Sequence, residues 1–221
     1  MKLLLTSTGF TSQIIVDACV QLANKPAAQV NIAVINEGYA VEPGDHSWVI
    51  EELATLKRTF GGTIELINLL ALDINVVIQR INTADVIYVV GGNTDYLMHI
   101  YNRTGFSMLL PELLETKVYV GSSAGSMVMG KRISTISYQN IFGEAETYGV
   151  EKYLELVDFA IKPHLNSLDW PNNRVDKLLT VSKDFEDALF GLSDSSAVSI
   201  EGNEIILIGT DWVKILNGTR V

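Results

Sequence analysis

Short apolar runs alternate with stretches in which apolar side chains recur at helical spacing through the first half of the chain. The apolar runs are bounded by turn residues and predict strands at 3–5, 30–35, 63–66, 85–90 and 118–120. The helical spacing predicts helices at 12–23, 48–60, 75–82, 94–102 and 108–114. Strands and helices that alternate in this way form parallel sheets with helices on both faces. The pattern therefore predicts an α/β protein with a mostly parallel sheet.

The second half of the chain is less regular and ends in strands. Residues 134–140 are predicted to be extended, 156–161 to form a strand and 172–183 a helix. Further strands are predicted at 188–192, 197–200, 204–208 and 212–216. Gly202 and Asn203 separate two of these strands and predict a C-terminal β-hairpin. Because no repeat, low-complexity tract or linker divides the chain, we expect residues 1–221 to form a single α/β domain.

Composition narrows the class of protein. The chain has 221 residues, of which 48% are hydrophobic, and a net charge of -10. This acidic balance repels phosphate backbones and anionic membrane surfaces, so nucleic acid and membranes are not expected partners. No apolar stretch approaches the roughly 20 residues of a membrane span. Cys19 is the single cysteine, which excludes an internal disulfide and fits a reducing, cytoplasmic location.

A glycine-flanked serine follows the strand predicted at 118–120. The segment Gly121–Gly125 reads Gly-Ser-Ser-Ala-Gly and leads into a small-residue run that predicts a helix beginning at Ala124. Strand, sharp turn and helix around G-x-S-x-G form a nucleophile elbow, in which the serine can attack a carbonyl carbon. The pentapeptide alone also occurs in structural glycine-rich turns. The predicted strand and helix on its two sides favour Ser123 as a nucleophile.

A serine nucleophile needs a base, and the chain contains three histidines. His46 lies in a predicted loop, and His99 lies within a predicted helix, where a structural role is usual. His164 follows the strand at 156–161, which places it at the carboxyl end of a strand, like Ser123. Asp194 ends the strand at 188–192 and is predicted to orient the imidazole of His164, although an aspartate there can equally cap a turn. The order serine, histidine, aspartate differs from that of an α/β-hydrolase.

A second glycine-containing loop also follows a strand. Gly91 and Gly92 come after the strand at 85–90 and open the next helix. The Gly92 amide, together with the Ala124 amide, is predicted to form an oxyanion hole. The alternative is a glycine pair that serves only as a helix entry. A dinucleotide-binding loop is disfavoured, because the G-x-G-x-x-G spacing is incomplete.

Together these segments resemble the peptidase E family, which comprises aspartyl dipeptidases and related cyanophycinases. The resemblance rests on four motifs in the family's order, at residues 89–94, 119–125, 162–164 and 191–194. It implies a fold similar to class I glutamine amidotransferases and a serine hydrolase without cofactor or metal. It also implies a small peptide substrate with an acidic residue before the scissile bond. By the same resemblance Ser123 is the nucleophile and His164 the base, while Asp194 stands where peptidase E has a glutamate.

The resemblance extends to substrate binding. Asn93 in the second loop and Arg174, which aligns with an arginine of the family, are the predicted substrate-binding residues. Arg174 would bind the acidic side chain of the substrate, and the alternative is an exposed surface arginine. The family has an aspartate shortly after the elbow helix, whereas this chain reads Ser-Tyr-Gln-Asn at 137–140. This departure weakens the case for strict dipeptide specificity.

Two functions follow from these residues. The first is a serine peptidase that hydrolyses short peptides with an N-terminal or P1 acidic residue through a Ser-His-Asp acyl-enzyme mechanism. The second is a catalytically weak or inactive module of the same fold that binds an acidic peptide or amino acid. An amidotransferase is disfavoured because that class carries a cysteine at the elbow, and Cys19 is far from it in the sequence. The sequence leaves the oligomeric state open.

Overall fold

The structure is a computed structural model that describes residues 1–143 and 148–221, and its strands form two sheets. The larger sheet has seven strands in the order β3-β2-β4-β5-β1-β8-β9. Its strands are β1 (Lys2–Thr6), β2 (Ile32–Ile35), β3 (Ile64–Ile67), β4 (Val86–Val89), β5 (Val118–Ser122), β8 (Ala197–Glu201) and β9 (Glu204–Ile208). The first five strands pair in parallel, and β8 and β9 add an antiparallel hairpin. The predicted α/β class, the mostly parallel sheet and the C-terminal hairpin are confirmed.

Side chains alternate between the two faces of this sheet and form two cores. On β4, Ile87 and Val89 join the core on one face, whereas Val86 and Tyr88 join the core on the other. The first face is covered by α3 (Ile74–Asn82), α4 (Thr94–Thr104) and α5 (Phe106–Leu113). The opposite face is covered by α1 (Gln13–Ala23) and α2 (Ser47–Thr59). Strands buried on both faces explain why the sequence shows continuous apolar runs there.

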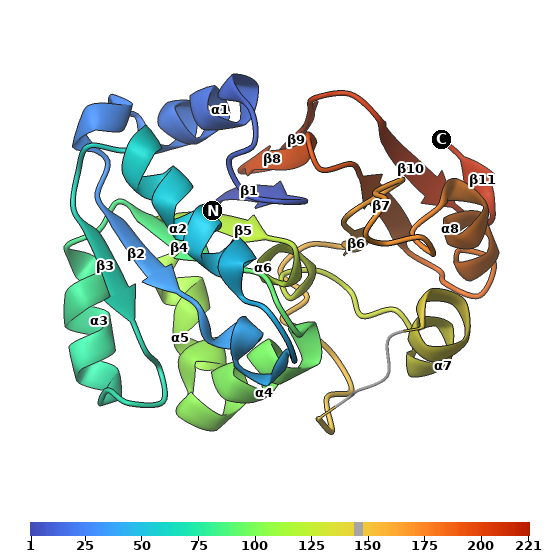
Figure 1. Ribbon diagram of the computed structural model, residues 1–221, viewed down its shortest axis with the longest axis horizontal. Coiled ribbons are helices and arrows are strands. Elements are labelled where there is room, and N and C mark those ends of the chain that lie inside the picture. The colour runs from blue at the N-terminus through green and yellow to red at the C-terminus, as the bar shows by residue number, and fades with distance from the viewer. Residues whose placement is uncertain (144–147) are drawn as a thin grey trace.

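A second sheet, which the sequence did not indicate, follows the elbow. It has the order β11-β10-β7-β6, with strands β6 (Phe159–Lys162), β7 (Ala188–Leu192), β10 (Trp212–Leu216) and β11 (Thr219–Arg220). It carries α8 (Val175–Val181) and lies on the opposite side of the molecule from β3 and α3 (Figure 1). Only β6 and β7 pair in parallel within it. Its buried side chains are continuous with the core under α3, α4 and α5.

Three details of the prediction are wrong or need adjustment. Residues 134–140 are not extended, because α7 (Thr135–Ser137) and the π-helical turn η3 (Tyr138–Phe142) occupy this segment, which the Ser134 hydroxyl caps by accepting from the Ser137 amide. The helix after the elbow, α6 (Ala124–Met127), is a single turn. The helix predicted at 172–183 begins only at Val175.

The remaining short turns are η1 (Ala27–Gln29) and η2 (Glu37–Val41). Across the two described ranges, 1–143 and 148–221, none of the helices is long and apolar enough to span a membrane.

Candidate active site

The elbow holds Ser123 in a strained backbone conformation at the end of β5. Ser123 has φ 49° and ψ -110°, a region in which non-glycine residues are rarely found. Such conformations cost about 1 to 3 kcal/mol and persist only where the surroundings enforce them. A Cβ on Gly121 would lie 2.5 Å from the carbonyl group of Gly125, and one on Gly125 would lie 2.4 Å from the Val89 oxygen. Both flanking glycines are therefore required by close backbone packing.

Buried hydroxyl groups hold the turn at Ser123 in place through hydrogen bonds to backbone oxygens. The Ser126 hydroxyl donates to the Thr6 oxygen at 2.7 Å and the Tyr119 hydroxyl to the Gly125 oxygen at 2.6 Å. The Ser123 amide donates to the Thr6 oxygen at 3.2 Å, which joins the elbow to the end of β1. These bonds satisfy buried carbonyl groups that the sharp turn would otherwise leave unpaired.

His164 and Asp194 reach Ser123 from the second sheet. In the parallel pair β6 and β7, Lys162 lies opposite Gly191, so the two strands end at the same level. His164 follows β6 and Asp194 follows β7, and their side chains meet beyond the strand ends. The prediction that both residues follow the carboxyl ends of strands is confirmed, although these strands belong to a different sheet from β5.

The three side chains form a continuous hydrogen-bonded chain. Ser123 Oγ lies 2.9 Å from His164 Nε2, and His164 Nδ1 lies 2.7 Å from Asp194 Oδ1. The side chain of His164 is 14% exposed and that of Asp194 is 43% exposed. This is the geometry in which a histidine accepts the proton of a serine hydroxyl while a carboxylate holds the imidazole.

Two hydroxyl groups after β1 hold Asp194 in place. The Thr8 hydroxyl donates to Asp194 Oδ1 at 2.7 Å and the Ser7 hydroxyl donates to the same oxygen at 3.0 Å. Ser7 also accepts from the His164 amide at 2.8 Å, so it connects two members of the triad. Ser7 and Thr8 could not be predicted from the sequence, because hydroxyl residues after a strand are too common to be a signal.

These contacts determine the charge of Asp194. Burial acts to raise its pKa, but the hydrogen bonds from His164 and Thr8, the charge of His164 and the hydrogen bond from Ser7 outweigh burial. The net effect is a pKa well below the ordinary value for aspartate. Asp194 is therefore ionised throughout the neutral range.

Trp170 covers one face of the His164 ring. The ring centroids lie 5.2 Å apart with an interplanar angle of 9°, and Trp170 is 42% exposed. His164 has φ 60°, so its backbone is also in the left-handed region. Stacking and the Ser7 bond together restrict the imidazole to the orientation that reaches Ser123. Like Ser7 and Thr8, Trp170 could not be predicted as part of the site from the sequence.

The glycine loop after β4 lies directly against Ser123. A Cβ on Gly91 would be 3.2 Å from the Ser123 Cβ. Gly92 has φ 122°, and a Cβ there would lie 2.2 Å from the carbonyl carbon of Gly38. The Asn93 amide donates to the Gly38 oxygen at 2.9 Å, which holds this loop against η2. Gly92 can therefore be only glycine without displacing one of the two loops.

The predicted substrate-binding residues have structural partners of their own. The Asn93 side-chain oxygen caps α4 by accepting from the Tyr96 amide at 2.9 Å. Arg174 lies at the N-cap of α8, and its Nη1 donates to the Trp170 and Asn173 oxygens, each at 3.1 Å. Because Trp170 stacks on His164, the Arg174 guanidinium is attached to the same loop that covers the triad.

The other two histidines remain outside this arrangement. His46 contacts the Glu42 oxygen and the Tyr39 ring, and His99 stacks on Tyr96. Within residues 1–143 and 148–221 no group of three or more histidine, cysteine or carboxylate side chains could hold a metal ion.

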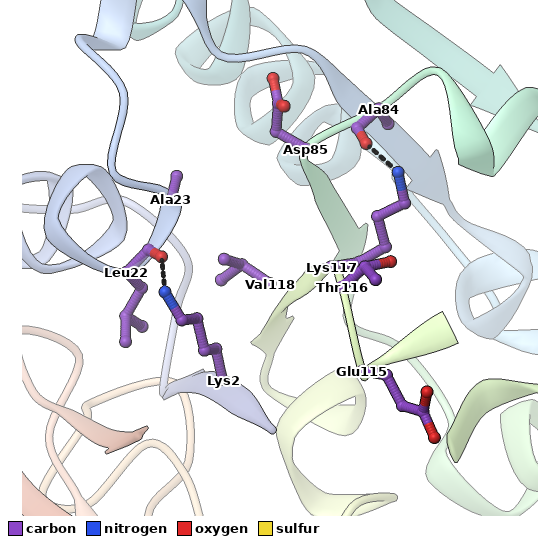
Figure 2. Close-up of a pocket in the computed structure, with 9 residues that line it drawn as sticks. All are labelled: Lys2, Leu22, Ala23, Ala84, Asp85, Glu115, Thr116, Lys117 and Val118. Atoms are coloured by element: carbon purple, nitrogen blue, oxygen red, sulfur yellow. Dashed lines mark hydrogen bonds between the residues drawn. The ribbon is translucent and has the colours of Figure 1, made fainter. Parts of the chain in front are cut away.

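A separate cavity of about 140 Å³ lies at the other end of the large sheet (Figure 2). Its lining includes Lys2 and Val118, which begin β1 and β5, and Asp85, which precedes β4. Ligands of open α/β sheets bind at the carboxyl ends of the strands, where Ser123 lies, rather than at these amino ends. The lysines of this cavity already donate to backbone oxygens, Lys2 to Leu22 and Lys117 to Ala84.

The hydrogen-bonded Ser-His-Asp arrangement is one that can support serine hydrolase chemistry, and comparisons with known proteins identify the family. The model of peptidase family S51 matches residues 3–208. The chain therefore belongs to peptidase family S51 and is a serine-type peptidase.

Individual relatives are similar at modest identity. An uncharacterized peptidase of Listeria monocytogenes is 27% identical over 150 residues, which cover 67% of this chain and 72% of that protein. Peptidase E of Shewanella baltica OS185 is 33% identical over 137 residues, which cover 59% of this chain and 56% of that protein.

Two solved structures are similar to this structure over nearly the whole chain. A crystal structure of a protein provisionally assigned as peptidase E from Listeria monocytogenes has a TM-score of 0.72 at 25% identity, covering 93% of this chain and 96% of its own. A peptidase from an acI-B1 Actinobacterium shares the fold, with a TM-score of 0.67 at 16% identity and coverage of 100% and 96%.

Proposed function

We propose that this peptidase hydrolyses short peptides with an N-terminal acidic residue, and that Ser123, His164 and Asp194 are its catalytic triad. The observation that carries the proposal is the unbroken hydrogen-bonded chain from Ser123 Oγ through both nitrogens of His164 to Asp194 Oδ1. Peptidase E relatives support a peptide substrate. The alternative of an inactive binding module is not favoured, because His164 is within hydrogen-bonding distance of both Ser123 and Asp194.

In the acylation step, Ser123 Oγ attacks the scissile carbonyl carbon while His164 Nε2 accepts the hydroxyl proton. The carbonyl oxygen becomes an oxyanion, for which the Gly92 and Ala124 amides are the proposed donors. No bond from the Gly92 amide to a backbone oxygen is found in the described part of the chain. When the carbon–nitrogen bond breaks, His164 passes its proton to the leaving amine and an ester to Ser123 remains.

In the deacylation step, a water molecule attacks the ester carbon and gives a proton to His164 Nε2. Collapse of the second tetrahedral intermediate breaks the bond to Ser123 Oγ, which regains its proton from His164. Asp194 stays ionised throughout and stabilises the imidazolium in both steps. The products are the free amino-terminal residue and the shortened peptide.

A library of dipeptides that varies the first residue tests the proposal directly, with released amino acids read by mass spectrometry. We expect aspartate, and to a lesser degree glutamate, to be released most rapidly. Rapid release of apolar or basic first residues, with acidic first residues left intact, would contradict the proposed specificity while leaving the peptidase assignment in place.

Arg174 is the proposed partner of the substrate's acidic side chain. A carboxylate leaves water at low cost only where a cation or several donors receive it. Arg174 bonds through Nη1 to two backbone oxygens, and a guanidinium has five N–H donors, so its other nitrogens can bind a ligand.

Replacement of Arg174 by methionine is expected to lower kcat/KM for aspartate-first dipeptides. The corresponding loss of transition-state stabilisation is about 1.5 to 3 kcal/mol, the range for a charged hydrogen bond. Alanine-first dipeptides serve as the matched control, and their kcat/KM should not change. Labelling of Ser123 by a fluorophosphonate should also persist in Arg174→Met. An equal loss for both dipeptides would assign Arg174 to the support of the Trp170 loop instead.

A further inference from the structure

Glu52 is a carboxylate turned inward beside the elbow. It lies on α2, where the Tyr88 hydroxyl donates to its Oε1 at 2.5 Å and the Ser122 hydroxyl also hydrogen-bonds to it. Tyr88 is fully buried and Ser122 is 2% exposed, while Glu52 retains accessible surface. The adjacent Glu51 instead lies in solvent and pairs with Arg58. Of these two neighbouring glutamates, only Glu52 faces the sheet.

The carboxylate of Glu52 lies between the elbow and the loop that supports the triad. Ser122 directly precedes Ser123, and Gly9 directly follows Thr8, which donates to Asp194. A Cβ on Gly9 would be 3.4 Å from Glu52 Oε1 and 3.6 Å from Ser122 Oγ. The same Cβ would lie only 2.3 Å from the Tyr88 hydroxyl, so glycine at position 9 lets this loop pack directly against the hydroxyl that donates to Glu52.

The Glu52 carboxylate forms no ion pair within the residues that the structure describes. No lysine or arginine of the described ranges forms an ion pair with it. Burial raises its pKa, and the hydrogen bonds from Tyr88 and Ser122 and the charge of His164 reverse only part of this effect. A buried carboxylate without a cation is destabilised, so a positive group on a ligand would be bound favourably there. The nearby Asp194 differs from Glu52, because its Oδ1 already accepts from His164, Thr8 and Ser7.

The proposed substrate carries a positive group close to its reacting carbon. In a peptide the α-nitrogen is about 2.5 Å from the carbonyl carbon of the same residue, so the α-ammonium of the first residue must bind beside the elbow. The segment at 137–140 contains no carboxylate, and its Tyr138 is buried against Arg132 and Lys162. That segment is thus electrostatically unsuited to an ammonium group.

We propose that Glu52 binds the α-ammonium of the substrate's first residue and thereby restricts the peptidase to free amino termini. This inference rests on the proposed function, since it assigns a specificity-determining residue to the same site. Glu52 and Arg174 then receive the two opposite charges of an acidic amino-terminal residue, which explains how an acidic protein binds such a substrate.

The test compares Asp-Leu with N-acetyl-Asp-Leu in the parent protein and in Glu52→Gln. Glutamine keeps the size of the side chain and an oxygen that can accept from Tyr88 and Ser122. We expect Glu52→Gln to lower kcat/KM for Asp-Leu by about 10- to 100-fold, chiefly through KM, and to leave the slower N-acetyl-Asp-Leu unchanged. Glu51→Gln, the matched control on the same helix, should change neither value.

Binding of the two peptides to Ser123→Ala, with and without Glu52→Gln, provides a measurement that does not depend on turnover. Calorimetry should show tighter binding of Asp-Leu than of N-acetyl-Asp-Leu, and Glu52→Gln should abolish this difference. A difference that survives Glu52→Gln, equal binding of the two peptides or no binding of either would overturn the inference. Failure of the proposed function has another signature, in which the parent binds Asp-Leu but does not cleave it.

Discussion

Ser123→Ala is expected to lower kcat for acidic-first dipeptides by about 10⁴- to 10⁶-fold, because the variant lacks the oxygen that forms the acyl-enzyme. KM should change little, since alanine removes one hydroxyl from a site whose other contacts remain. Activity is measured on Asp-Leu by release of aspartate, with enough enzyme to detect the residual rate. The variant should also fail to form a covalent adduct with a fluorophosphonate.

Ser107→Ala is the matched control for this substitution. Ser107 lies on α5, away from the elbow, and its replacement should leave both kcat and adduct formation at the parental values. Circular dichroism should show that Ser123→Ala is folded, because alanine keeps the Cβ and the backbone conformation and removes only a half-buried hydroxyl group. Hydrolysis by Ser123→Ala at the parental rate would exclude the proposed mechanism.

The parallel half of the fold could be predicted because its signal is local. On β4 every residue from Val86 to Val89 is buried, so the strand appears in the sequence as an apolar run between a turn and a glycine pair. The second sheet has no such signal, because whether β6 and β7 join β1 or form their own sheet depends on contacts distant in sequence. The segment at 134–140 was predicted wrongly for a related reason, since burial of Tyr138 and Phe142 decides its conformation more than local propensity does.

Strand ends explain which site residues could be anticipated. Ser123, His164 and Asp194 each follow an apolar run, so the sequence predicts all three at the carboxyl ends of strands. The hydrogen-bonded distances from His164 to Ser123 and to Asp194 agree with this prediction. Glu52 could not be found in this way. It lies within an amphipathic helix beside the exposed Glu51, and only the contact of α2 with Tyr88 and Ser122 distinguishes the two glutamates.

Asp194→Asn is expected to lower kcat by about 10³- to 10⁴-fold, because a neutral amide neither stabilises the imidazolium nor enforces the tautomer of His164 that accepts from Ser123. In the parent, Asp194 Oδ1 accepts from His164 at 2.7 Å and from Thr8 at 2.7 Å, and both bonds weaken when the acceptor loses its charge. Asp194→Glu, which keeps the charge and matches the glutamate of peptidase E, should retain far more activity. A loss of less than tenfold in Asp194→Asn would argue that another group orients His164.

The same variant should alter the dependence of stability on pH in acid. Because the native pKa of Asp194 is lowered, the unfolded chain binds more protons at this residue than the folded chain does between the native pKa and the unfolded value of about 3.9. The stabilisation of the folded state by ionised Asp194 is therefore complete above the pKa of Asp194 in the unfolded chain. It is lost as the pH falls toward the lower pKa of Asp194 in the folded chain. Urea unfolding of the parent should show a free energy that declines more steeply below about pH 4 than that of Asp194→Asn, which has no carboxylate to protonate. If the free energy of unfolding had the same pH dependence in the parent and in Asp194→Asn, the ionised carboxylate would contribute nothing to the stability of the folded state. The evidence for a catalytic role of its charge would then be the loss of kcat alone.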